Sequence, residues 1–478
     1  MKTIKKIYTR VIFRLVSPLS ISNGKDAVTD RDLLLDSKGM PYIPGSAVAG
    51  VTREAAKLTE KEICRYFGDI GNGSEADITE SRLVFFDAVL YAAQKEVPEK
   101  KQSKAGHKGM MAISYKEASQ QKTVKELQDE IQPIVSVRDS VALDEFKNSV
   151  PGAKFDMEVL EPGVMFSTFI EQNICDGDKD ITKEILQAWI DDEIRFGGKT
   201  TRGYGEIKVE KVQTKEFDFN NPKDIKTWLK FRPESAVSGW SVLELEKSDS
   251  SENISIDLSL KLKSCISVRK YSAKPSTEEK AEPDFVQLTV GDKPVIPGTT
   301  WSGAFRHHIR KLAPLKEEFE WVKPVVRKDG SIEEVIVHDN YFGKVVPDGE
   351  KTKSHIMFNE STIDESTPKT MTRNAINRFT GGSAATALFT AKVYYGGVLP
   401  LRITFRRLPG DQKYSRDFVN AFFAAIADLH EGFLSIGGET SVGRGLFEVI
   451  KVADQDFHGT GADLYALLND QFGKELTL

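Results

Sequence analysis

The chain has little cysteine for its length of 478 residues, because Cys64, Cys175 and Cys265 stand alone and far apart. They form no CxxC pair and have no closely spaced histidine pair nearby, which argues against a structural zinc site and a disulfide framework. We therefore expect a reducing compartment, the cytoplasm. An excess of one charge is also lacking, since 66 Lys and Arg face 71 Asp and Glu. The formal net charge of −5 gives no indication of a polyanionic partner, so any nucleic-acid surface must be local.

Long uncharged hydrophobic runs are absent as well, so we expect no membrane-spanning helix. The basic start, MKTIKKIYTRVIFRLV, has Arg10 and Arg14 inside what would have to be the apolar core of a signal peptide, and it is more typical of a strand. The chain does have 40% hydrophobic residues, among them 27 Phe, 12 Tyr and 5 Trp, which is enough to bury a core. At roughly 100 to 200 residues per domain, its length predicts about two to four domains.

Internal repetition decides the predicted architecture. Four segments of the first half recur in the same order in the second half. They pair as PYIPGSAVAGVTREAAKL (41–58) with PVIPGTTWSGAFRHHIRKL (294–312), RYFGD (65–69) with NYFGK (340–344), SRLVFFDA (81–88) with SHIMFNES (354–361), and FGGKTTRGYGEIKV (196–209) with IGGETSVGRGLFEV (436–449). Two homologous domains follow from this order.

Each repeat has the pattern of a strand, a helix, several strands and a closing strand. This pattern predicts an α+β ferredoxin-like sandwich, which is also the sheet topology of a common RNA-binding module. The opening strands are expected at 7–16 and 254–262, and the helix after each IPG turn has Ser46 or Thr299 as its expected N-cap.

The expected domain boundaries follow from composition between the repeats. We predict domains at 1–213 and 254–452, a linker at 214–253 with two prolines and the polar run KSDSSE, and a C-terminal tail with a short helix at 453–478. Segment 93–130 has no counterpart in the second half and is predicted as a basic loop inserted in the first domain. A solvated surface insertion without function is the alternative.

Two glycine-rich loops, GG(x4)GxG at 197–205 and 437–445, carry the strongest chemical signal. Glycines let backbone N–H groups approach a ligand closely, so such a loop can hold phosphates, whereas a single tight turn uses glycine for steric reasons alone. Two copies at the same place in two repeats favour the phosphate interpretation. The predicted RNA-binding residues of these loops are Gly198, Lys199, Arg202, Gly203, Gly438, Gly443 and Arg444.

The two IPG turns give a second candidate for phosphate binding. A helix N-terminus presents unpaired N–H groups and a positive dipole end, so Ser46 and Thr299 are expected at an anion site. Arg53 and Arg306 lie at the same position of the two helices and are expected to add a charged contact. The alternative is that Pro and Gly only shape the turn and that the arginines are solvated.

The loop before the first IPG turn, GKDAVTDRDLLLD, contains Asp26, Asp30, Asp32 and Asp36. Closely spaced carboxylates beside a phosphate-binding surface could hold Mg²⁺ or orient a hydroxyl for attack. Acidic loop residues are more often caps and solvated groups, so composition by itself favours the plainer interpretation. No histidine has a companion at metal-ligand spacing, and we interpret the histidines as structural or solvent-facing.

Together the IPGS turn with its arginine-bearing helix, a central RxxV stretch and the terminal glycine loop resemble the RAMP superfamily of CRISPR-associated proteins. Within it, the chain is most similar to backbone subunits of type III effector complexes, here as a tandem fusion of two units. The resemblance covers about 8–210 and 254–452. It implies two tandem ferredoxin-like (RRM-like) RAMP domains, each with an inserted thumb hairpin and a C-terminal glycine-rich loop. The thumbs should lie at 136–163 and 372–397.

The resemblance also implies site residues. Arg138 and Arg373 fall where the family places RNA-contacting arginines. The family's catalytic, metal-associated aspartate matches Asp30, six residues before Asp36 in a pattern like DxxhhxD(x4)PhIPGS. In the second half an ungapped alignment places Pro283 there, with Asp284 one residue later and Glu282 one earlier. Asp284 is therefore the predicted second catalytic residue. Both copies also lack the lysine that often precedes the helix glycine, since Ala49 and Ser302 stand there.

The resulting hypothesis is a subunit that binds guide (CRISPR) RNA and other effector subunits, and that cuts complementary target RNA with a divalent cation, Mg²⁺ or Mn²⁺. The proposed chemistry is attack of the 2′-hydroxyl on the adjacent phosphate. One alternative is a structural guide-binding subunit without nuclease activity. The other, a guide-RNA-processing endonuclease, would carry its general-base histidine early in the first domain, but the first histidine here is His107.

Overall fold

The computed structural model divides into two compact units, Met1–Thr200 with Tyr204–Ser251, and Thr201–Gly203 with Glu252–Leu478. The structure describes residues 3–22, 29–69, 79–91, 134–143, 149–233, 239–248, 253–271, 283–312, 322–326, 332–336, 341–343, 353–408 and 413–477. The predicted basic insertion at 93–130 lies outside these residues. No helix among the described residues is long and apolar enough to cross a membrane.

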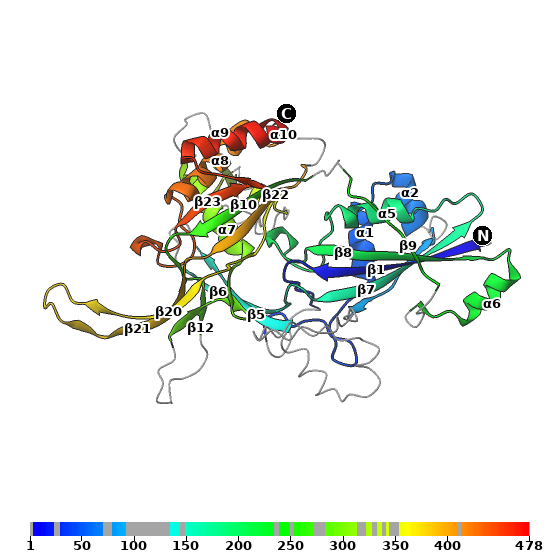
Figure 1. Ribbon diagram of the computed structural model, residues 1–478, viewed down its shortest axis with the longest axis horizontal. Coiled ribbons are helices and arrows are strands. Elements are labelled where there is room, and N and C mark those ends of the chain that lie inside the picture. Colours follow the sequence, from blue (N-terminus) through cyan, green and yellow to red (C-terminus); the bar gives the residue numbers. More distant parts are fainter. Residues whose placement is uncertain are drawn as a thin grey trace, which may run out of the picture. The chain divides into compact units, whose positions relative to one another are not determined.

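The first unit has a ferredoxin-like sheet (Figure 1). Its central strand β1 pairs antiparallel with β7 on one side and with β8 on the other, and β3 and β4 pair with the far side of β7. In chain order helix α1 lies between β1 and β3, and helix α5 lies between β7 and β8. The bounds are β1 Thr3–Leu15, β2 Tyr42–Ile43, α1 Gly45–Ala55, β3 Leu83–Phe85, β4 Ala88–Leu90, β7 Met165–Cys175, α5 Thr182–Ile190 and β8 Ile207–Asp218.

The second unit repeats this topology. Its sheet has the order β18-β22-β10-β23-β24, so its opening strand β10 lies between β22 and β23, as β1 lies between β7 and β8. Helix α7 lies between β10 and β18 in the chain, and helix α8 connects β22 to β23. The prediction of two ferredoxin-like domains is therefore confirmed. The bounds are β10 Ile254–Leu262, β15 Lys293–Ile296, α7 Gly298–Leu312, β18 Ile356–Phe358, β19 Ser361–Thr362, β22 Val398–Phe405, α8 Arg416–Glu431, β23 Phe447–Val452 and β24 Gln455–Asp456.

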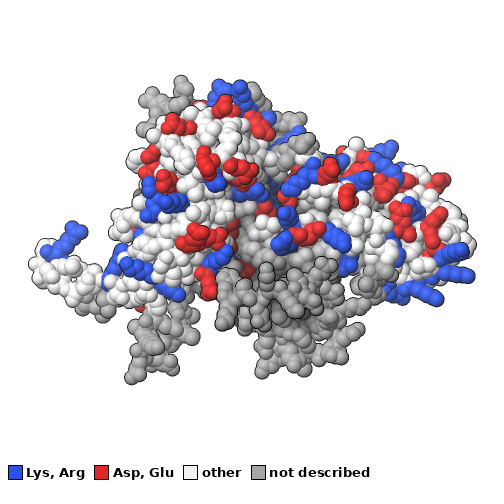
Figure 2. Space-filling view, in the orientation of Figure 1, with Lys and Arg blue, Asp and Glu red and all other residues white. Residues whose placement is uncertain are grey.

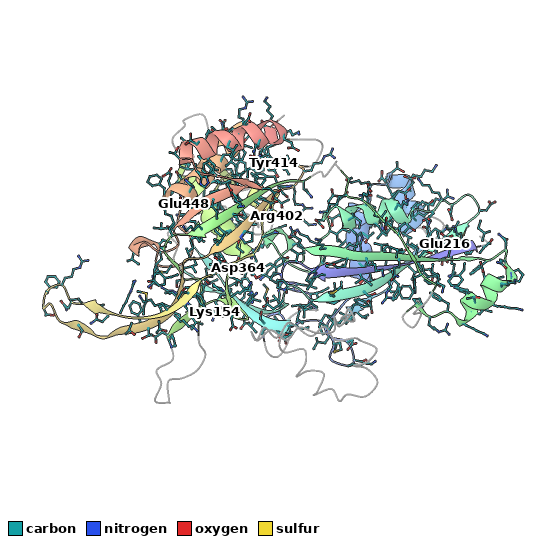
Figure 3. The ribbon with its side chains drawn as sticks, viewed as in Figure 1. Lys154, Glu216, Asp364, Arg402, Tyr414 and Glu448 are labelled. Carbon is teal, nitrogen blue, oxygen red and sulfur yellow. The ribbon has the colours of Figure 1, made fainter. Side chains whose placement is uncertain are left out.

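Side-chain periodicity explains these elements. Alternation along β10 buries Ile256, Leu258 and Leu260. Asp257 faces the other side of the sheet and pairs at 2.7 and 2.9 Å with Arg402 of β22, which is labelled in Figure 3. Helical spacing along α7 buries Trp301, Phe305 and Ile309 in the same core. A corresponding core in the first unit contains Phe13, Val48 and Trp189. The two helices that connect the strands, α1 and α5 in the first unit and α7 and α8 in the second, thus pack on one face of each sheet.

The start of α1 differs from the prediction. The helix begins at Gly45 and its N-cap is Pro44, so Ser46 is not the N-cap; Thr299 likewise lies inside α7, which begins at Gly298. The amide of Gly45 donates instead to the Asp87 carboxylate at 2.7 Å. A Cβ at Gly45 would overlap the carbonyl oxygen of Phe85, so close packing against the end of β3 sets the helix start.

The segment predicted as a linker, 214–253, folds as part of the first unit. Strand β8 runs on to Asp218, helix α6 (Pro222–Lys230) follows, and β9 (Ser241–Val242) pairs with β8. Aromatic contacts fasten this segment to the sheet: the Phe231 and Tyr8 ring centroids are 4.9 Å apart, and Trp228 Nε1 donates to the Tyr8 hydroxyl at 3.0 Å. The proline that suggested a linker stands at N1 of α6, where proline is favourable.

The predicted tail at 453–478 does contain a short helix, α9 (Gly461–Leu468), followed by a π-helical turn and α10 (Lys474–Thr477). Leu464, Leu468 and Leu476 belong to the core of the second unit. The tail therefore completes that core.

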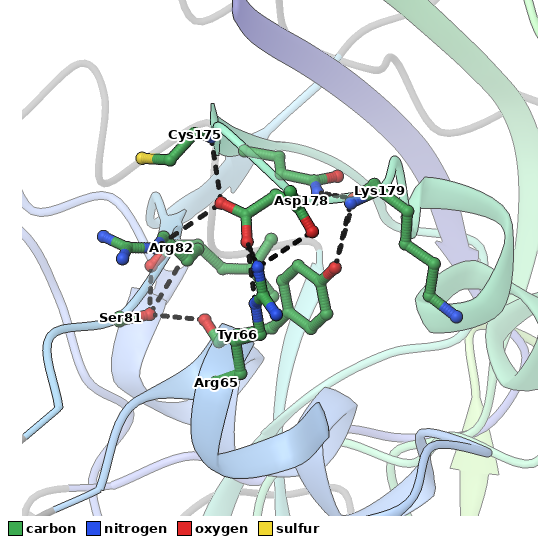
Figure 4. A network of polar contacts seen from close by, with 10 residues as sticks. Arg65, Tyr66, Ser81, Arg82, Cys175, Asp178 and Lys179 are labelled. Atoms are coloured by element: carbon green, nitrogen blue, oxygen red, sulfur yellow. Dashed lines mark hydrogen bonds and ion pairs between the residues drawn. The ribbon is translucent and has the colours of Figure 1, made fainter. Parts of the chain in front are cut away.

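A polar network fastens helix α2 (Glu60–Phe67) of the first unit to the turn after β7 (Figure 4). Asp178, whose side chain is buried, accepts from Arg65 Nε at 2.7 Å and from the Cys175 amide at 2.9 Å. Arg82 Nε lies 3.6 Å from Asp178 Oδ2, the oxygen that accepts from the Cys175 amide. The RYFGD motif of the first repeat thus has a structural role, because its arginine neutralises a buried carboxylate.

Candidate nucleic-acid interface

Both predicted thumbs are antiparallel hairpins. In the first unit β5 (Val135–Leu143) pairs with β6 (Ser149–Leu160), and in the second unit β20 (Thr367–Ile376) pairs with β21 (Ser383–Tyr395). The β20–β21 hairpin projects from the body of its unit (Figure 1). Its turn residue Phe379 is 100% exposed, and Ile376 beside it is also exposed. An exposed aromatic ring at the end of a hairpin provides a surface on which a base can stack.

Asp30, the predicted catalytic residue, is exposed and lies against the first hairpin. The amide of Asp156 on β6 donates to Asp30 Oδ2 at 3.1 Å, and the amide of Asp30 donates to Asp156 Oδ1 at 2.9 Å. This reciprocal pair fixes the carboxylate of Asp30 at the edge of the thumb.

Asp284 also lies against its hairpin, but its amide donates to a backbone carbonyl where the Asp30 amide donates to a carboxylate. The amide of Thr390 on β21 donates to Asp284 Oδ2 at 2.7 Å, and the amide of Asp284 donates to the Thr390 carbonyl at 2.9 Å. Thr390 precedes the Gly396–Gly397 pair by as many residues as Asp156 precedes Pro162–Gly163. The geometry therefore makes Asp284, and not Pro283, the counterpart of Asp30. Glu282 lies outside the described residues.

The other acidic residues of the first loop have local partners. Asp32 Oδ1 accepts from the Thr29 amide at 2.8 Å. Asp36 Oδ1 accepts from the amides of Lys38 and Met40 at 2.8 and 2.9 Å, as a turn residue does. Asp26 lies outside the described residues. Within the described part of the chain, no group of three or more His, Cys, Asp or Glu side chains gathers as a ready-made metal site.

The two glycine loops have the same backbone geometry. In the first, the amide of Gly198 donates to the Ser20 carbonyl at 2.7 Å, and in the second the amide of Gly438 donates to the Ser267 carbonyl at 2.8 Å. Each loop continues as a short 3₁₀ turn, Thr200–Arg202 or Thr440–Val442, and then reaches a glycine at positive φ, +84° at Gly203 and +80° at Gly443. Their backbone is therefore set by contacts to the strand end after β1 or β10.

The residue after the double glycine reverses its charge between the loops. Lys199 and Glu439 both have positive φ, 57° and 58°. Lys199 Nζ lies 3.8 Å from the centroid of the Phe155 ring on β6. Glu439 instead faces three arginines: Arg269 NH2 is 3.1 Å from Oε1, and Arg373 NH1 and Arg444 NH1 both contact Oε2. One predicted loop is thus cationic at this position, and the other carries an internal carboxylate.

Two of the predicted RNA-binding arginines are buried. Arg138 is 2% exposed and pairs with the Glu161 carboxylate at 2.9 Å, and Arg444 is 2% exposed and pairs with Glu439. In this geometry they neutralise protein carboxylates beneath the hairpins. Arg373 differs, because its side chain is 35% exposed and its NH1 lies 3.7 Å from Glu439 Oε2.

The helix residues form a separate group. Ser46 and Arg53 are exposed on α1, whereas Thr299 and Arg306 on α7 are half-buried. The Asp87 carboxylate already holds the first amide of α1, so the predicted anion site at that helix start has a protein acceptor. Within the second unit, Arg373 and Arg444 meet at Glu439, the residue after Gly438. Within the first unit, Ser46 and Arg53 lie on helix α1.

Sequence reasoning missed Arg269 and Glu439. A signal for Glu439 is present in the repeat alignment, where GGK in the first loop faces GGE in the second. Arg269 lies on β12 (Arg269–Tyr271), and a Cβ placed at Gly438 would lie 3.5 Å from its Nε. The tertiary contact between this strand and the loop is not readable from spacing.

Basic and acidic side chains are interspersed over the visible face of each unit (Figure 2), in keeping with a net charge of −5. The model of one protein family, the RAMP superfamily, matches residues 12–208 and 276–448. The two matches fall on the two repeats and together cover well over half of the chain. No curated protein matches the chain.

Proposed function

The chain belongs to the RAMP superfamily, and from this membership we propose that it is a guide-RNA-binding backbone subunit of a type III CRISPR effector complex that cleaves complementary RNA. The membership itself implies a CRISPR-associated, RNA-binding role. The observation that carries the finer proposal is the repetition of one constellation: a ferredoxin-like sheet, a thumb hairpin with an aspartate at its edge, and a glycine loop, once in each repeat of the sequence.

In the proposed reaction the 2′-oxygen of the target forms a bond to the adjacent phosphorus while the bond from phosphorus to O5′ breaks. The 2′-hydroxyl loses its proton and O5′ gains one, which leaves a cyclic 2′,3′-phosphate and a 5′-hydroxyl. The exposed Asp30 carboxylate, fixed by the Asp156 amide, would orient the 2′-hydroxyl group or accept its proton. Asp284, fixed by Thr390, would do the same in the second unit.

The donor set fits a divalent cation only in part. Asp30 and Asp156 bring two carboxylates close together through their reciprocal backbone bonds. Mg²⁺ is commonly held by one or two carboxylates and completed by substrate phosphates and water, so these residues suit Mg²⁺ or Mn²⁺ when RNA is present. A bound cation would supply charge neutralisation at the phosphate.

A non-catalytic role is the second candidate, and one observation favours it. Both aspartates accept a backbone amide of their hairpin, as a residue that only positions the thumb would do. Asparagine separates the two candidates, because its carbonyl oxygen can still accept that amide while its charge is lost.

The test is a denaturing gel of a guide-matched target RNA incubated with the assembled complex. The variants are wild type, Asp30→Asn, Asp284→Asn and the double substitution, each with Mg²⁺ and with a chelator. Catalysis predicts that Asp30→Asn loses the cut at the first thumb by about 100-fold or more and that the double variant is inactive, with RNA binding retained. Undiminished cleavage in the double variant, or no cleavage by wild type, would establish the structural role.

A further inference from the structure

Three arginines of the second unit converge on one carboxylate. Arg269 NH2 lies 3.1 Å from Glu439 Oε1, Arg373 NH1 lies 3.7 Å from Oε2, and Arg444 NH1 also contacts Oε2. The arginines come from β12, from the thumb strand β20 and from the glycine loop itself. A carboxylate and a phosphodiester both present oxygens that guanidinium groups bind in the same way. The site occupied by Glu439 therefore has the chemistry of a phosphate site.

The exposure of these side chains shows how RNA could reach the site. Arg269 and Arg373 are 33% and 35% exposed, whereas Glu439 is 13% and Arg444 is 2% exposed. Two arginines thus form the open rim and the third forms the floor. Because a buried arginine is costly without a counter-ion, some anion must face Arg444 whenever the unit is folded. Either Glu439 or an incoming phosphate can serve.

The first unit lacks this internal anion. Lys199 occupies the position of Glu439 and its ammonium group lies over the Phe155 ring, and the buried Arg138 has its own partner in Glu161. The two loops also differ at a second position, where Tyr204 stands in the first and Arg444 in the second. The internal carboxylate is therefore present only in the loop that also carries a buried arginine, and it stands where a phosphate could neutralise that arginine instead.

We propose that Arg269, Arg373 and Arg444 form a binding site for one phosphodiester of RNA, and that the Glu439 carboxylate occupies this site as an internal competitor in the RNA-free chain. RNA binding at the second unit then requires Glu439 to leave, and its affinity is lower there than at the first unit. The identity of the polyanion as RNA rests on the proposed function. The competition itself rests on the contacts of Glu439.

The test uses the full chain with Glu439→Gln, which removes the charge and keeps the side-chain size. Two probes are used. Binding of inorganic phosphate is measured as the change in unfolding temperature between phosphate and chloride buffers of equal ionic strength. Binding of a fluorescent oligouridine is measured by anisotropy. We expect Glu439→Gln to lower the unfolding temperature in chloride, to gain more from phosphate than wild type does, and to bind oligouridine about fivefold more tightly. Its log–log salt slope should steepen by about 0.7.

Two further variants keep the test decisive. Asp456→Asn removes one charge from the exposed Asp456–Lys451 pair of the same unit and should behave as wild type. Arg269→Gln leaves the Glu439–Arg444 pair in place and should lose the phosphate response. If Glu439→Gln does not fold in chloride, recovery in phosphate supports the proposal and failure to recover overturns it.

The outcomes also separate this inference from the proposed function. An unchanged phosphate response together with unchanged or weaker oligouridine binding by Glu439→Gln overturns the inference, even if wild type binds RNA. A larger phosphate response in Glu439→Gln, with no RNA binding by any variant, supports the anion site and overturns the RNA-binding proposal.

Discussion

Arginines that the sequence placed at the same point of the two thumbs differ in their surroundings. Arg138 is buried and pairs with Glu161, which directly precedes the Pro162–Gly163 turn. The second unit has Tyr395 at that point, and burial and a hydrogen bond with Cys265 raise the pKa of its hydroxyl. Tyr395 therefore stays neutral and offers no charge to Arg373, which pairs with Glu439 near the surface.

This difference predicts unequal costs of substitution. Arg138→Met leaves the Glu161 carboxylate buried without its cation, so we expect the free energy of unfolding to fall by about 3–5 kcal/mol. Arg373→Met removes a pair that is one third exposed, and should cost less than about 1 kcal/mol while weakening RNA binding. Urea denaturation and anisotropy measure the two effects. Adding Glu161→Leu to Arg138→Met should recover most of the stability; equal costs for the two arginines would contradict this account.

At the level of residues, the aspartates taken from the resemblance both lie against their hairpins, and their catalytic role stays a prediction. Asp284 is displaced by one residue from the position that aligns with Asp30, but its carboxylate still lies against the hairpin. The burial of Arg138 could not be found, since it depends on Glu161, which lies on the far side of the hairpin in sequence. Charge partners that meet only after folding leave no periodic signal.

Among the elements, the glycine loops have the most demanding backbone. Gly445 has a φ of +70°, and a Cβ there would overlap the carbonyl oxygen of Ile436. Gly443 has a φ of +80°, yet a Cβ there would meet nothing within 4 Å. Gly443 is thus required only by its backbone conformation, whereas Gly445 is required by its conformation and by close packing.

Alanine substitutions in the second loop should therefore have graded effects. Gly443→Ala should lower the free energy of unfolding by about 1 kcal/mol, the cost of a left-handed conformation for an L-residue. Gly445→Ala should cost at least about 2 kcal/mol more, because the backbone of the loop must move as well. Chemical denaturation of the full chain checks the order, and a smaller loss for Gly445→Ala than for Gly443→Ala would refute it.

Elements marked by repetition were predicted well, whereas the segment 214–253, which lies outside the repeats, was not. Both helices after the IPG turns lie where the repeats placed them, and both hairpins lie where the resemblance to the family placed them. The segment 214–253 was predicted as a linker because it holds prolines and polar residues, but Pro222 begins a helix and the strand before it continues to Asp218. Its aromatic side chains, which fasten it to the sheet, carried the signal that composition concealed.

For the whole molecule, charge is balanced and RNA contacts are expected to be local. Arg373, Arg269 and Lys199 stand close to glycine loops or hairpins, within a chain of net charge −5. We expect RNA affinity to fall linearly with salt on a log–log scale, with a slope of about −0.7 per neutralised phosphate of single-stranded RNA. Binding should depend little on base sequence, since phosphate contacts carry none.

Anisotropy titrations with oligouridine and a mixed-sequence RNA over a range of salt concentrations measure both properties. A control with a chain carrying Asp456→Asn shows how much one remote charge changes the slope. An affinity that ignores salt, or one that strongly prefers one base sequence, would exclude backbone-directed binding.

The two sheets end in very short strands. Strands β2, β9 and β24 have two residues each, and β18 has three. Long, exposed edge strands invite pairing with another copy of a chain, and proteins commonly blunt such edges by shortening them. Each sheet is therefore protected at both margins from growth by strand addition. In concentrated solution, copies of this chain are therefore not expected to polymerise through the margins of these two described sheets.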